Sequence, residues 1–488
     1  MSNPELAFLP WEGMGHLVPM VELAKLMLER NQILSISILV MRTSMDFGAD
    51  KYLDSVTSDS GHPRLRFLDL RQYNDPEDAG GEVVLNPDNF LFDFIHSQTA
   101  HVRRFAQTNY ADSECDRPRL VGFVIDMFCA PMIDVANEFS VPTYLFFASS
   151  IGFLGLSLHF QALKHDHKED TSRYKNSDEE LSIPYFANPV RGKVLPSPMV
   201  EKNPATDMFF DGVKRYKETK GIMVNTFGEL EHYALQALSD TKTVPPVYPV
   251  GPLLNLEAGH GRNKASQSES IMKWLDDQPT SSVVFLCFGS FGSFEEKQVT
   301  EIATALELSG HRFLWSLRRR PPKGKLELPA DYENPAEVLP EGFLERTKAV
   351  GKVIGWAPQL AVLSHPAVGG FVSHCGWNSL LESIWCGVPI ATWPLYAEQQ
   401  INAFWAIKEV GIAAEIRMDY NVGGLGGNEE DNIVTAEEIR KGIMEIMSNG
   451  DIRKKVKEMK EMSRKAMIEG GLSYTALDTL LKAVIDTI

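Results

Sequence analysis

Apolar runs of strand length alternate with amphipathic segments of helix length along most of the chain. Strands that are buried on both faces have such continuous apolar runs, and the intervening helices cover the two faces of a parallel sheet. The pattern therefore predicts an α/β unit with a parallel sheet in the first half. The expected helices include Leu17–Arg30 and Pro131–Phe139. The expected strands are Leu6–Trp11, Ile33–Val40, Leu65–Leu70, Leu120–Asp126, Thr143–Phe147 and Ile222–Phe227.

The alternation stops at Val244–Pro252, which reads VPPVYPVGP, and then starts again. Four prolines in nine residues exclude a central strand or a helix, so we interpret this segment as an interdomain linker. We expect two doubly wound halves whose carboxyl edges face each other across a cleft. The expected domains are residues 1–243 and 263–465, with the linker at 244–262 and a terminal segment at 466–488. The expected strands of the second half are Val283–Phe288, Phe313–Arg318, Lys352–Gly355, Gly369–Ser373 and Pro389–Trp393.

Two capping-box patterns predict helix starts. Ser293-x-x-Glu296 opens a helix at Ser293–Leu308, and Thr435-x-x-Glu438 opens another. The last segment, Tyr474–Ile488, is an amphipathic helix whose apolar face is expected to dock on the first domain. Two polar segments, Arg319–Leu339 and Asp419–Asn432, are interpreted as surface loops, with decoration favoured over a functional lid.

The charge balance excludes some partners. The chain has 48 Lys and Arg against 65 Asp and Glu, a net charge of −17, which argues against nucleic acids and anionic membranes. The five cysteines form no C-x-x-C motif and are interpreted as reduced thiols. No basic leader precedes the first strand, and no apolar run reaches the length of about eighteen residues that a membrane span requires. We expect a cytoplasmic protein without a membrane span.

The stretch Trp356–Gln399 carries the most chemical information. It contains a strand, the turn His374-Cys375-Gly376 and a helix that begins at Trp377. A helix that opens directly after a strand presents free N–H groups and a positive dipole end, which favour a phosphate. Asn378 and Ser379 in the first helical turn, and His374 before it, could add donors to the same phosphate. Glu382, one turn later, is suited to accept two ribose hydroxyls.

Both ends of this stretch carry further candidates. The indole of Trp356 could stack on a flat base, with backbone groups at Ala357 reading the base edge and Gln359 on the same turn. Glu398 and Gln399 follow a strand and could bind the hydroxyls of a hexose. Each residue alone also has a plain structural explanation, as a core tryptophan, a solvated glutamate or a helix cap. Their joint arrangement favours the functional interpretation.

This stretch resembles the signature box of plant UDP-glycosyltransferases, members of glycosyltransferase family one, and it has the family's length of 44 residues. The resemblance extends over the whole chain in length and element order. The family's fixed positions are present as Trp356, Gln359, His374, Gly376, Trp377, Asn378, Ser379, Glu382, Glu398 and Gln399.

The resemblance implies the GT-B fold, an acceptor-binding N-terminal domain and a C-terminal domain that binds a UDP-sugar. It also implies that Trp356 stacks on uracil and Glu382 holds the ribose. His374, Asn378 and Ser379 would then hold the diphosphate, while Glu398 and Gln399 bind the sugar. A terminal glutamine is associated in the family with glucose, so Gln399 favours UDP-glucose.

His16 and Asp126 are the candidate base and its partner. His16 follows the first expected strand in the motif Gly13-Met14-Gly15-His16, beside a helix N-terminus that should keep its ring neutral. Asp126 ends another expected strand, where its carboxylate could fix the tautomer of a histidine. A histidine that caps the following helix, and an aspartate that caps Pro131–Phe139, are the structural alternatives. In the family that this chain resembles, the two positions are the catalytic base and its partner.

The segment Phe288-Gly289-Ser290-Phe291-Gly292 lacks the G-x-G-x-x-G dinucleotide fingerprint. Family members place a serine here against the diphosphate, which makes Ser290 a candidate, although a plain strand-to-helix turn is the alternative. No D-x-D pair is present, and the His165-Asp166-His167 triplet is interpreted as a solvated loop. We therefore expect chemistry that needs neither a metal nor a cofactor.

The expected reaction is a single displacement that inverts the anomeric configuration and forms a β-O-glucoside. The expected acceptor is a small lipophilic aglycone, phenolic or flavonoid by resemblance, with terpenoids as the alternative. Rival functions are a UDP-sugar epimerase or hydrolase of the same fold and a non-catalytic UDP-sugar sensor. We expect a monomer. The candidate aromatic residues of the acceptor site are Phe128, Phe146, Phe147, Phe153, Phe209 and Phe210, of which Phe146 and Phe147 are better explained as core.

Overall fold

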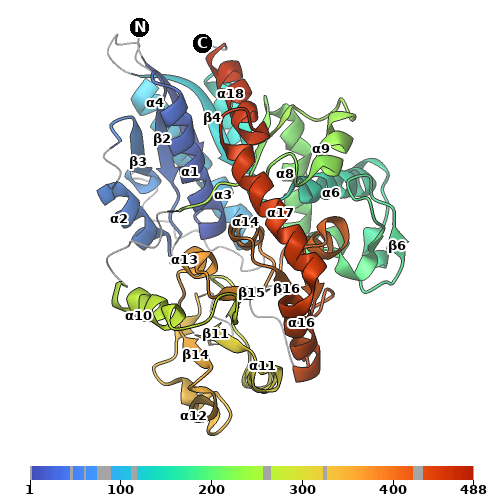
Figure 1. Ribbon diagram of the computed structural model, residues 1–488. Coiled ribbons are helices and arrows are strands. Elements are labelled where there is room, and N and C mark those ends of the chain that lie inside the picture. The colour runs from blue at the N-terminus through green and yellow to red at the C-terminus, as the bar shows by residue number, and fades with distance from the viewer. Residues whose placement is uncertain are drawn as a thin grey trace.

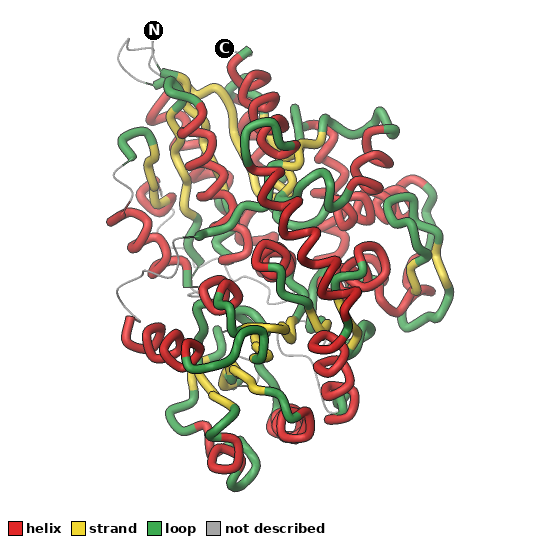
Figure 2. The backbone as a smooth tube through the Cα atoms, in the orientation of Figure 1, coloured by secondary structure: helices red, strands yellow, loops and turns green. Residues whose placement is uncertain are grey.

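The computed structural model describes residues 3–43, 48–59, 62–73, 89–110, 118–256, 265–322, 327–420 and 432–486. Within these ranges the chain forms two parallel sheets, one in each half, with helices on both faces (Figures 1 and 2). The strands consist of apolar residues that are buried on both faces; all six residues of β1, for example, are buried. The predicted α/β architecture with two doubly wound domains is therefore confirmed.

The first sheet has the strand order β3-β2-β1-β4-β5-β8-β9 among the described residues. All of its pairings are parallel. Its strands are β1 Pro4–Leu9, β2 Ser35–Val40, β3 Leu65–Asp69, β4 Arg119–Asp126, β5 Thr143–Phe147, β8 Ile222–Val224 and β9 Val247–Pro249. Its helices are α1 Met14–Arg30, α2 Ala49–Asp59, α3 Phe90–Ser97, α4 Thr99–Tyr110, α5 Met132–Glu138, α6 Ile151–Gln161, α7 Ser197–Val200, α8 Pro204–Arg215 and α9 His232–Ser239.

The second sheet has the order β14-β11-β10-β15-β16-β17, again with parallel pairings. Its strands are β10 Val283–Cys287, β11 Arg312–Ser316, β14 Gly351–Ile354, β15 Val368–Ser373, β16 Ile390–Thr392 and β17 Ala413–Glu415. The helices of this half are α10 Ala265–Asp276, α11 Glu296–Ser309, α12 Phe343–Thr347, α13 Gln359–Ser364, α14 Trp377–Cys386, α15 Gln399–Phe404, α16 Ala436–Ser448, α17 Gly450–Met467 and α18 Leu472–Ile485. Two short hairpins, β6 Glu180–Leu181 with β7 Val190–Arg191 and β12 Arg318–Arg319 with β13 Ala330–Asp331, stand apart from both sheets.

Each sheet has one point at which the direction of winding reverses. In the first sheet the chain builds outward from β1 on one side through β2 and β3, and on the other side it begins at β4. In the second sheet β10 is followed by β11 and β14 on one side, and β15 begins the other. Ligands of open parallel sheets bind beside the carboxyl ends of the strands at such switch points. The strand order therefore predicts two ligand-binding crevices, one after β1 and β4 and one after β10 and β15.

The observed elements differ from the predicted ones in three places. Part of the expected linker, Val247–Pro249, forms the strand β9, which tolerates prolines because, in the described part of the chain, it lies at the sheet edge and pairs with β8 alone. The short strand Ala413–Glu415 was not predicted from the sequence. The predicted capping box at Ser293 is wrong, because α11 begins at Glu296 with Glu295 as its N-cap. Phe294 is buried against Phe288 and Trp393, which keeps the chain extended up to that point.

The capping box at Thr435 and Glu438 is present as predicted. The loop at Arg319–Leu339 includes one strand of the hairpin β12–β13 and, in part, lies outside the described residues. Of the other predicted loop, Asp419–Asn432, residues 421–431 lie outside the described ranges. Cys115 also lies outside them, and the four described cysteines are free thiols.

The C-terminal helix α18 returns to the first half, as Figure 1 shows, after the long helix α17 has run along the second half. Its apolar residues Leu477, Leu480, Leu481 and Val484 are buried in the same core as Leu6 and Phe8 of β1. The Arg30 guanidinium at the end of α1 donates to the Tyr474 carbonyl at 2.9 Å and lies over the Tyr474 ring. The chain therefore crosses between the halves twice.

None of the helices described here is long and apolar enough to cross a membrane.

Candidate active site between the two halves

His16 and Asp126 meet at the switch point of the first sheet. His16 lies in the first turn of α1, directly after β1, and Asp126 is the last residue of the neighbouring strand β4. The His16 Nδ1 and an Asp126 carboxylate oxygen are 2.8 Å apart. The other Asp126 oxygen accepts from the Phe128 backbone N–H at 3.0 Å. The Asp126 side chain is fully buried, whereas 22% of the His16 side chain is exposed.

The sequence left open whether His16 and Asp126 are a catalytic pair or helix caps, and the structure decides this question. The N-cap of α1 is Gly13 and the N-cap of α5 is Pro131, and neither helix has a side-chain cap. His16 and Asp126 are therefore not helix caps. The hydrogen bond to Asp126 occupies Nδ1, which leaves Nε2 as the ring nitrogen with a lone pair when the imidazole is neutral.

The pKa of His16 differs from the expectation drawn from the helix dipole. Burial lowers this pKa, but the charge and the hydrogen bond of Asp126, with a smaller contribution from Glu398, together raise it above the ordinary value of 6.5. The expected influence of the helix N-terminus, which disfavours the charged ring, is outweighed by the carboxylate in direct contact with it. His16 is therefore a stronger base than an ordinary histidine.

His374 occupies the switch point of the second sheet, immediately after β15. The ring lies close to two glycines, and a Cβ at Gly289 or at Gly376 would come within 2.5 or 2.6 Å of its Nε2. The residue is 6% exposed, and its Nδ1 has no hydrogen-bond partner among the described residues. Burial lowers the pKa of His374 to about 4, so the ring is neutral at physiological pH. A buried polar atom without a partner at a helix N-terminus fits the approach of an anionic ligand.

Trp356 lies on the turn between β14 and α13 and is one of the few large apolar side chains with substantial exposure, at 39%. Asp331 of the hairpin β12–β13 accepts from its backbone N–H at 2.9 Å. The Arg318 Nε lies 3.0 Å from the same Asp331 oxygen. Because a Cβ on Gly355 would collide with the Asp331 carboxyl group, glycine is required there. The indole therefore has an exposed face on a turn that is held in position.

Gln359 links two other residues that the sequence predicts to bind the UDP-sugar. Its amide nitrogen donates to the Ser379 Oγ and to a Glu382 carboxylate oxygen, both at 2.8 Å. Burial raises the pKa of Glu382 to about 7, although the hydrogen bond from Gln359 lowers it in part. Ala357, on the turn that precedes α13, is buried. Ser290 is exposed on the turn after β10, at the same edge of the sheet.

Trp377 and Asn378 contact the first half. The Trp377 indole nitrogen donates to the Asn225 carbonyl at 2.7 Å, and its ring packs against Trp405 with centroids 5.1 Å apart. The Asn378 amide donates to the Gly15 carbonyl at 2.9 Å and accepts from the Asn225 amide at 3.2 Å. The side chain of Trp377 therefore serves the interface between the halves, and Asn378 places the start of α14 next to the His16 turn.

Glu398 and Gln399 lie after β16 at the start of α15. A Glu398 carboxylate oxygen accepts from the Asn402 amide at 3.3 Å, and burial raises the pKa of Glu398. The Gln399 Oε1 accepts from the backbone N–H groups of Leu395 and Tyr396, at 2.8 and 3.1 Å. These bonds fix the turn that carries Glu398 toward His16.

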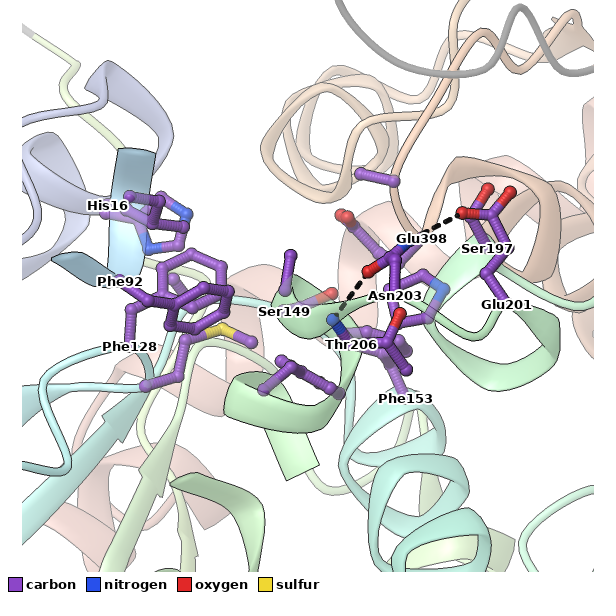
Figure 3. Close-up of a pocket in the computed structure, with 17 residues that line it drawn as sticks. His16, Phe92, Phe128, Ser149, Phe153, Ser197, Glu201, Asn203, Thr206 and Glu398 are labelled. Carbon is purple, nitrogen blue, oxygen red and sulfur yellow. Dashed lines mark hydrogen bonds between the residues drawn. The ribbon is translucent and has the colours of Figure 1, made fainter. Parts of the chain in front are cut away.

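A cavity of about 330 Å³ lies between His16 and Glu398 and extends into the first half (Figure 3). Apolar atoms dominate its wall, and the Phe128 ring lies 5.2 Å from the His16 ring. The residues that line it are His16, Leu91, Phe92, Met127, Phe128, Ala148, Ser149, Phe153, Ser197, Pro198, Glu201, Asn203, Ala205, Thr206, Phe209, Ala397 and Glu398.

Comparison with known proteins gives a consistent result. Residues 235–422 match the family model described as "UDP-glucoronosyl and UDP-glucosyl transferase". The chain is 52% identical to UDP-glycosyltransferase 71E1 of Stevia rebaudiana over 486 residues, which cover 99% of each chain. It is also 52% identical to a putative UDP-glucose flavonoid 3-O-glucosyltransferase 3 of Fragaria ananassa, over 98% of each chain. The chain belongs to the plant UDP-glycosyltransferases.

Solved structures agree with this assignment. A transferase of Siraitia grosvenorii in complex with UDP superposes with a TM-score of 0.87 at 44% identity, covering 99% of this chain and 100% of the other. A Medicago truncatula enzyme complexed with UDP-glucose gives a TM-score of 0.84 at 40% identity, covering 99% and 98%. The expected GT-B fold is confirmed.

The structure of this UDP-glycosyltransferase divides the six candidate phenylalanines into two groups. Phe128, Phe153 and Phe209 line the cavity. Phe146, Phe147 and Phe210 are fully buried in the core, so Phe210 was wrongly placed among the acceptor candidates.

Sequence reasoning missed several lining residues of this UDP-glycosyltransferase, which lie on α3 and near α7 and α8. The run Phe90–Ile95 is apolar enough to have signalled a buried helix. The missed lining residues on these segments are Leu91, Phe92, Ser197, Pro198, Glu201, Asn203, Ala205 and Thr206, and those that follow strands are Met127, Ala148, Ser149 and Ala397.

Proposed function

We propose that this enzyme transfers glucose from UDP-glucose to a hydroxyl group of a small, largely apolar acceptor and forms a β-O-glucoside with inversion. One observation carries the proposal. His16, hydrogen-bonded to Asp126, and Glu398 from the opposite half line the same cavity. A base and a candidate sugar-binding carboxylate thus lie at one reacting centre.

The proposed step is a single displacement. The His16 Nε2 takes the proton of the acceptor hydroxyl while its oxygen attacks the anomeric carbon. The bond from that carbon to the diphosphate oxygen breaks, and UDP leaves on the opposite face. The transition state has oxocarbenium character, as in glycoside hydrolysis. Asp126 stabilises the imidazolium that forms, and the N-terminus of α14 with His374 stabilises the charge that develops on the diphosphate.

The donor assignment rests on residues at one sheet edge. We assign Trp356 and Ala357 to the base, Glu382 with Gln359 to the ribose, and Glu398 with Gln399 to the sugar. The remaining residues, Ser290, His374, Gly376, Asn378 and Ser379, are assigned to the diphosphate. The bound UDP-glucose of the Medicago truncatula relative supports this donor. Trp377 is assigned to the interface between the halves.

The acceptor class is inferred from the wall of the cavity. Its volume lies near the lower end of the range for ligand pockets, about 300–1,000 Å³, which suits one aglycone. Phe92, Phe128, Phe153 and Phe209 favour a planar aromatic molecule. A second Fragaria ananassa relative, 50% identical, is named as a flavonoid 3-O-glucosyltransferase. We therefore propose phenolic or flavonoid acceptors, with terpenoids as the alternative.

We further propose a metal-independent, monomeric, cytoplasmic enzyme. Among the described residues no group of three or more potential metal ligands is present. Full turnover in the presence of EDTA and elution at about 55 kDa would agree with the first two points, since the chain mass is 54.6 kDa.

The decisive experiment is an acceptor screen with UDP-glucose, in which mass spectrometry detects a hexose adduct and NMR assigns the anomeric configuration. We expect adducts on phenolic aglycones with β configuration. Release of free glucose without an acceptor would indicate a hydrolase, and an altered UDP-hexose would indicate an epimerase. UDP-glucose binding without turnover on any acceptor would indicate a sensor and overturn the proposal.

A further inference from the structure

The polar groups of the acceptor cavity are unevenly distributed along it. His16, Phe92 and Phe128 lie together at one end in Figure 3, and Ser197, Glu201 and Asn203 lie at the other. The aromatic rings of Phe153 and Phe209, stacked with centroids 6.5 Å apart, form part of the wall. An acceptor held at His16 by one hydroxyl therefore extends past Ser149 and Glu398 toward a second polar end.

The carboxylate of Glu201 is fixed at that second end. Asn203 caps α8 by accepting from the Thr206 N–H at 2.8 Å, which orients its amide. The Asn203 amide nitrogen then donates to the Glu201 Oε2 at 3.2 Å. The Lys175 Nζ, on a side chain that is 54% exposed, approaches the Glu201 Oε1 at 3.3 Å. A carboxylate accepts about four hydrogen bonds, so these two contacts leave acceptor capacity for a ligand.

The carboxylates that line the cavity have no cationic side chain beside them in its wall. Among its described lining residues there is no lysine or arginine, whereas Glu201 and Glu398 contribute carboxylates. Lys175 contacts the Glu201 carboxylate and Lys164 donates to the Glu201 backbone carbonyl at 3.1 Å, but neither lysine lines the cavity. A ligand carboxylate at the Glu201 end would face another carboxylate and would lose its hydration without gaining a cationic partner. A neutral hydroxyl, in contrast, would donate to a charged acceptor, the stronger class of hydrogen bond.

We propose that Glu201, positioned by Asn203, determines acceptor specificity: it binds a second, uncharged hydroxyl of the acceptor and excludes acceptors that carry a carboxylate at that place. This inference rests on the proposed glucosyl transfer. It adds to that proposal a preference for acceptors that have an uncharged hydroxyl at the end far from His16. The enzyme then prefers rigid aromatic diols over matched molecules with a single hydroxyl.

The test uses three rigid acceptors that differ only at the distal position: 4-hydroxybiphenyl, 4,4′-dihydroxybiphenyl and 4′-hydroxybiphenyl-4-carboxylate. Glucose transfer from saturating UDP-glucose is measured as kcat/KM, and the diol value is halved for its two equivalent hydroxyls. We expect the diol to exceed the mono-hydroxy compound by about 10- to 100-fold, the range for a hydrogen bond to a charged group. The carboxylate should be the poorest acceptor.

Two variants of Glu201 separate the hydrogen bond from the charge. Glu201→Ala should reduce the corrected diol preference to about one, because the hydrogen-bond acceptor is lost. Glu201→Gln should raise the relative kcat/KM of the carboxylate acceptor by about 10-fold, because the charge is removed and an amide donor is introduced. The KM for UDP-glucose should stay at the wild-type value in both, because the Glu201 carboxylate contacts Lys175 and Asn203, neither of which is assigned to the donor.

Two further variants serve as controls. Glu180→Ala removes an exposed carboxylate that pairs with Arg191 outside the cavity, and it should alter none of the three ratios. Lys175→Ala should keep the diol preference and disfavour the carboxylate acceptor further, because Glu201 loses its counter-ion.

The outcomes distinguish this inference from the proposed function. If no acceptor in the phenolic screen receives a hexose, the proposed function fails. If the enzyme glucosylates phenolic acceptors but refuses the biphenyls, or treats all three alike in wild type and Glu201→Ala, only the role of Glu201 is overturned. Equal thermal unfolding temperatures of the variants and the wild type would confirm that the ratios reflect recognition rather than loss of fold.

Discussion

The two sides of the cleft are built in opposite ways. On the donor side, one continuous stretch from Trp356 to Gln399 supplies nearly all candidate groups, and hydrogen bonds link Gln359 to both Ser379 and Glu382. On the acceptor side, the cavity wall comes from separate segments on α1, α3, α6 and α8 and around α7, and most of its groups are apolar. Local sequence therefore specifies the donor, whereas the acceptor depends on how distant segments pack.

The largest expected effect concerns the residue at which the two sides meet. His16→Ala should reduce kcat by about 100- to 10,000-fold, the usual contribution of a general base. UDP-glucose affinity, measured by calorimetry, should stay within a factor of about three, because the role proposed for His16 is to bind the acceptor hydroxyl rather than the donor. Wild-type kcat in this variant would remove His16 from the reaction.

The second prediction concerns the pH dependence of the same pair. The base must be neutral, so kcat/KM should fall as the pH drops through the raised pKa of His16, above 6.5. Asp126→Asn should move this acid limb to lower pH, because burial lowers the pKa and the opposing charge of Asp126 is gone. It should also lower kcat by about 100-fold through loss of imidazolium stabilisation. If the acid limb of kcat/KM stays at the same pH in Asp126→Asn, a group other than His16 is responsible for it.

The third prediction tests whether the donor side extends beyond its continuous stretch. Asp331→Ala should raise the KM for UDP-glucose by about 10-fold with little change in kcat, because the Trp356 turn loses its anchor. Asp331→Asn keeps an oxygen for the Trp356 N–H and should recover most of the affinity. Asp178→Ala, on an exposed ion pair with Lys193, is the matched surface control. Equal KM values in all variants would restrict donor recognition to the continuous stretch.

The smallest effect is expected at Trp377, which lies within the donor stretch but contacts the other half. Trp377→Phe removes the hydrogen bond to the Asn225 carbonyl and should reduce the free energy of unfolding by about 1–3 kcal/mol. The KM for UDP-glucose should change less than twofold. Denaturant unfolding and initial-rate kinetics measure the two quantities, and a large rise in KM without loss of stability would place Trp377 in the donor site.

The sequence predicted the sheets and the polar edge for a physical reason. Continuous apolar runs specify buried parallel strands, and the residues that follow β1, β4, β10 and β15 must lie at the switch points of the sheets. The sequence therefore placed His16, Asp126 and His374 at strand ends, while the roles assigned to them came from the family resemblance. The direction of the His16 pKa shift could not be predicted from the sequence, because it depends on the 2.8 Å contact with Asp126 and on Glu398 from the other half.

The other site residues could not be predicted, because their positions depend on packing that no local sequence pattern encodes. Phe209 lines the cavity and its neighbour Phe210 is core, although both are apolar residues on α8. Asp331 lies in a segment that we interpreted as decoration, yet it anchors the Trp356 turn from 25 positions away along the chain. Such roles become visible only when the approach of two segments is known.

The second crossing of the chain has a mechanical consequence. The Ser473 hydroxyl at the start of α18 donates to the Gly251 carbonyl at 2.6 Å, so the outgoing and returning segments touch each other. Both described ends of these connections are therefore anchored to the first half at one place. A rotation of the second half would leave the Ser473–Gly251 contact nearly fixed, and the width of the cleft would change most at the points farthest from it.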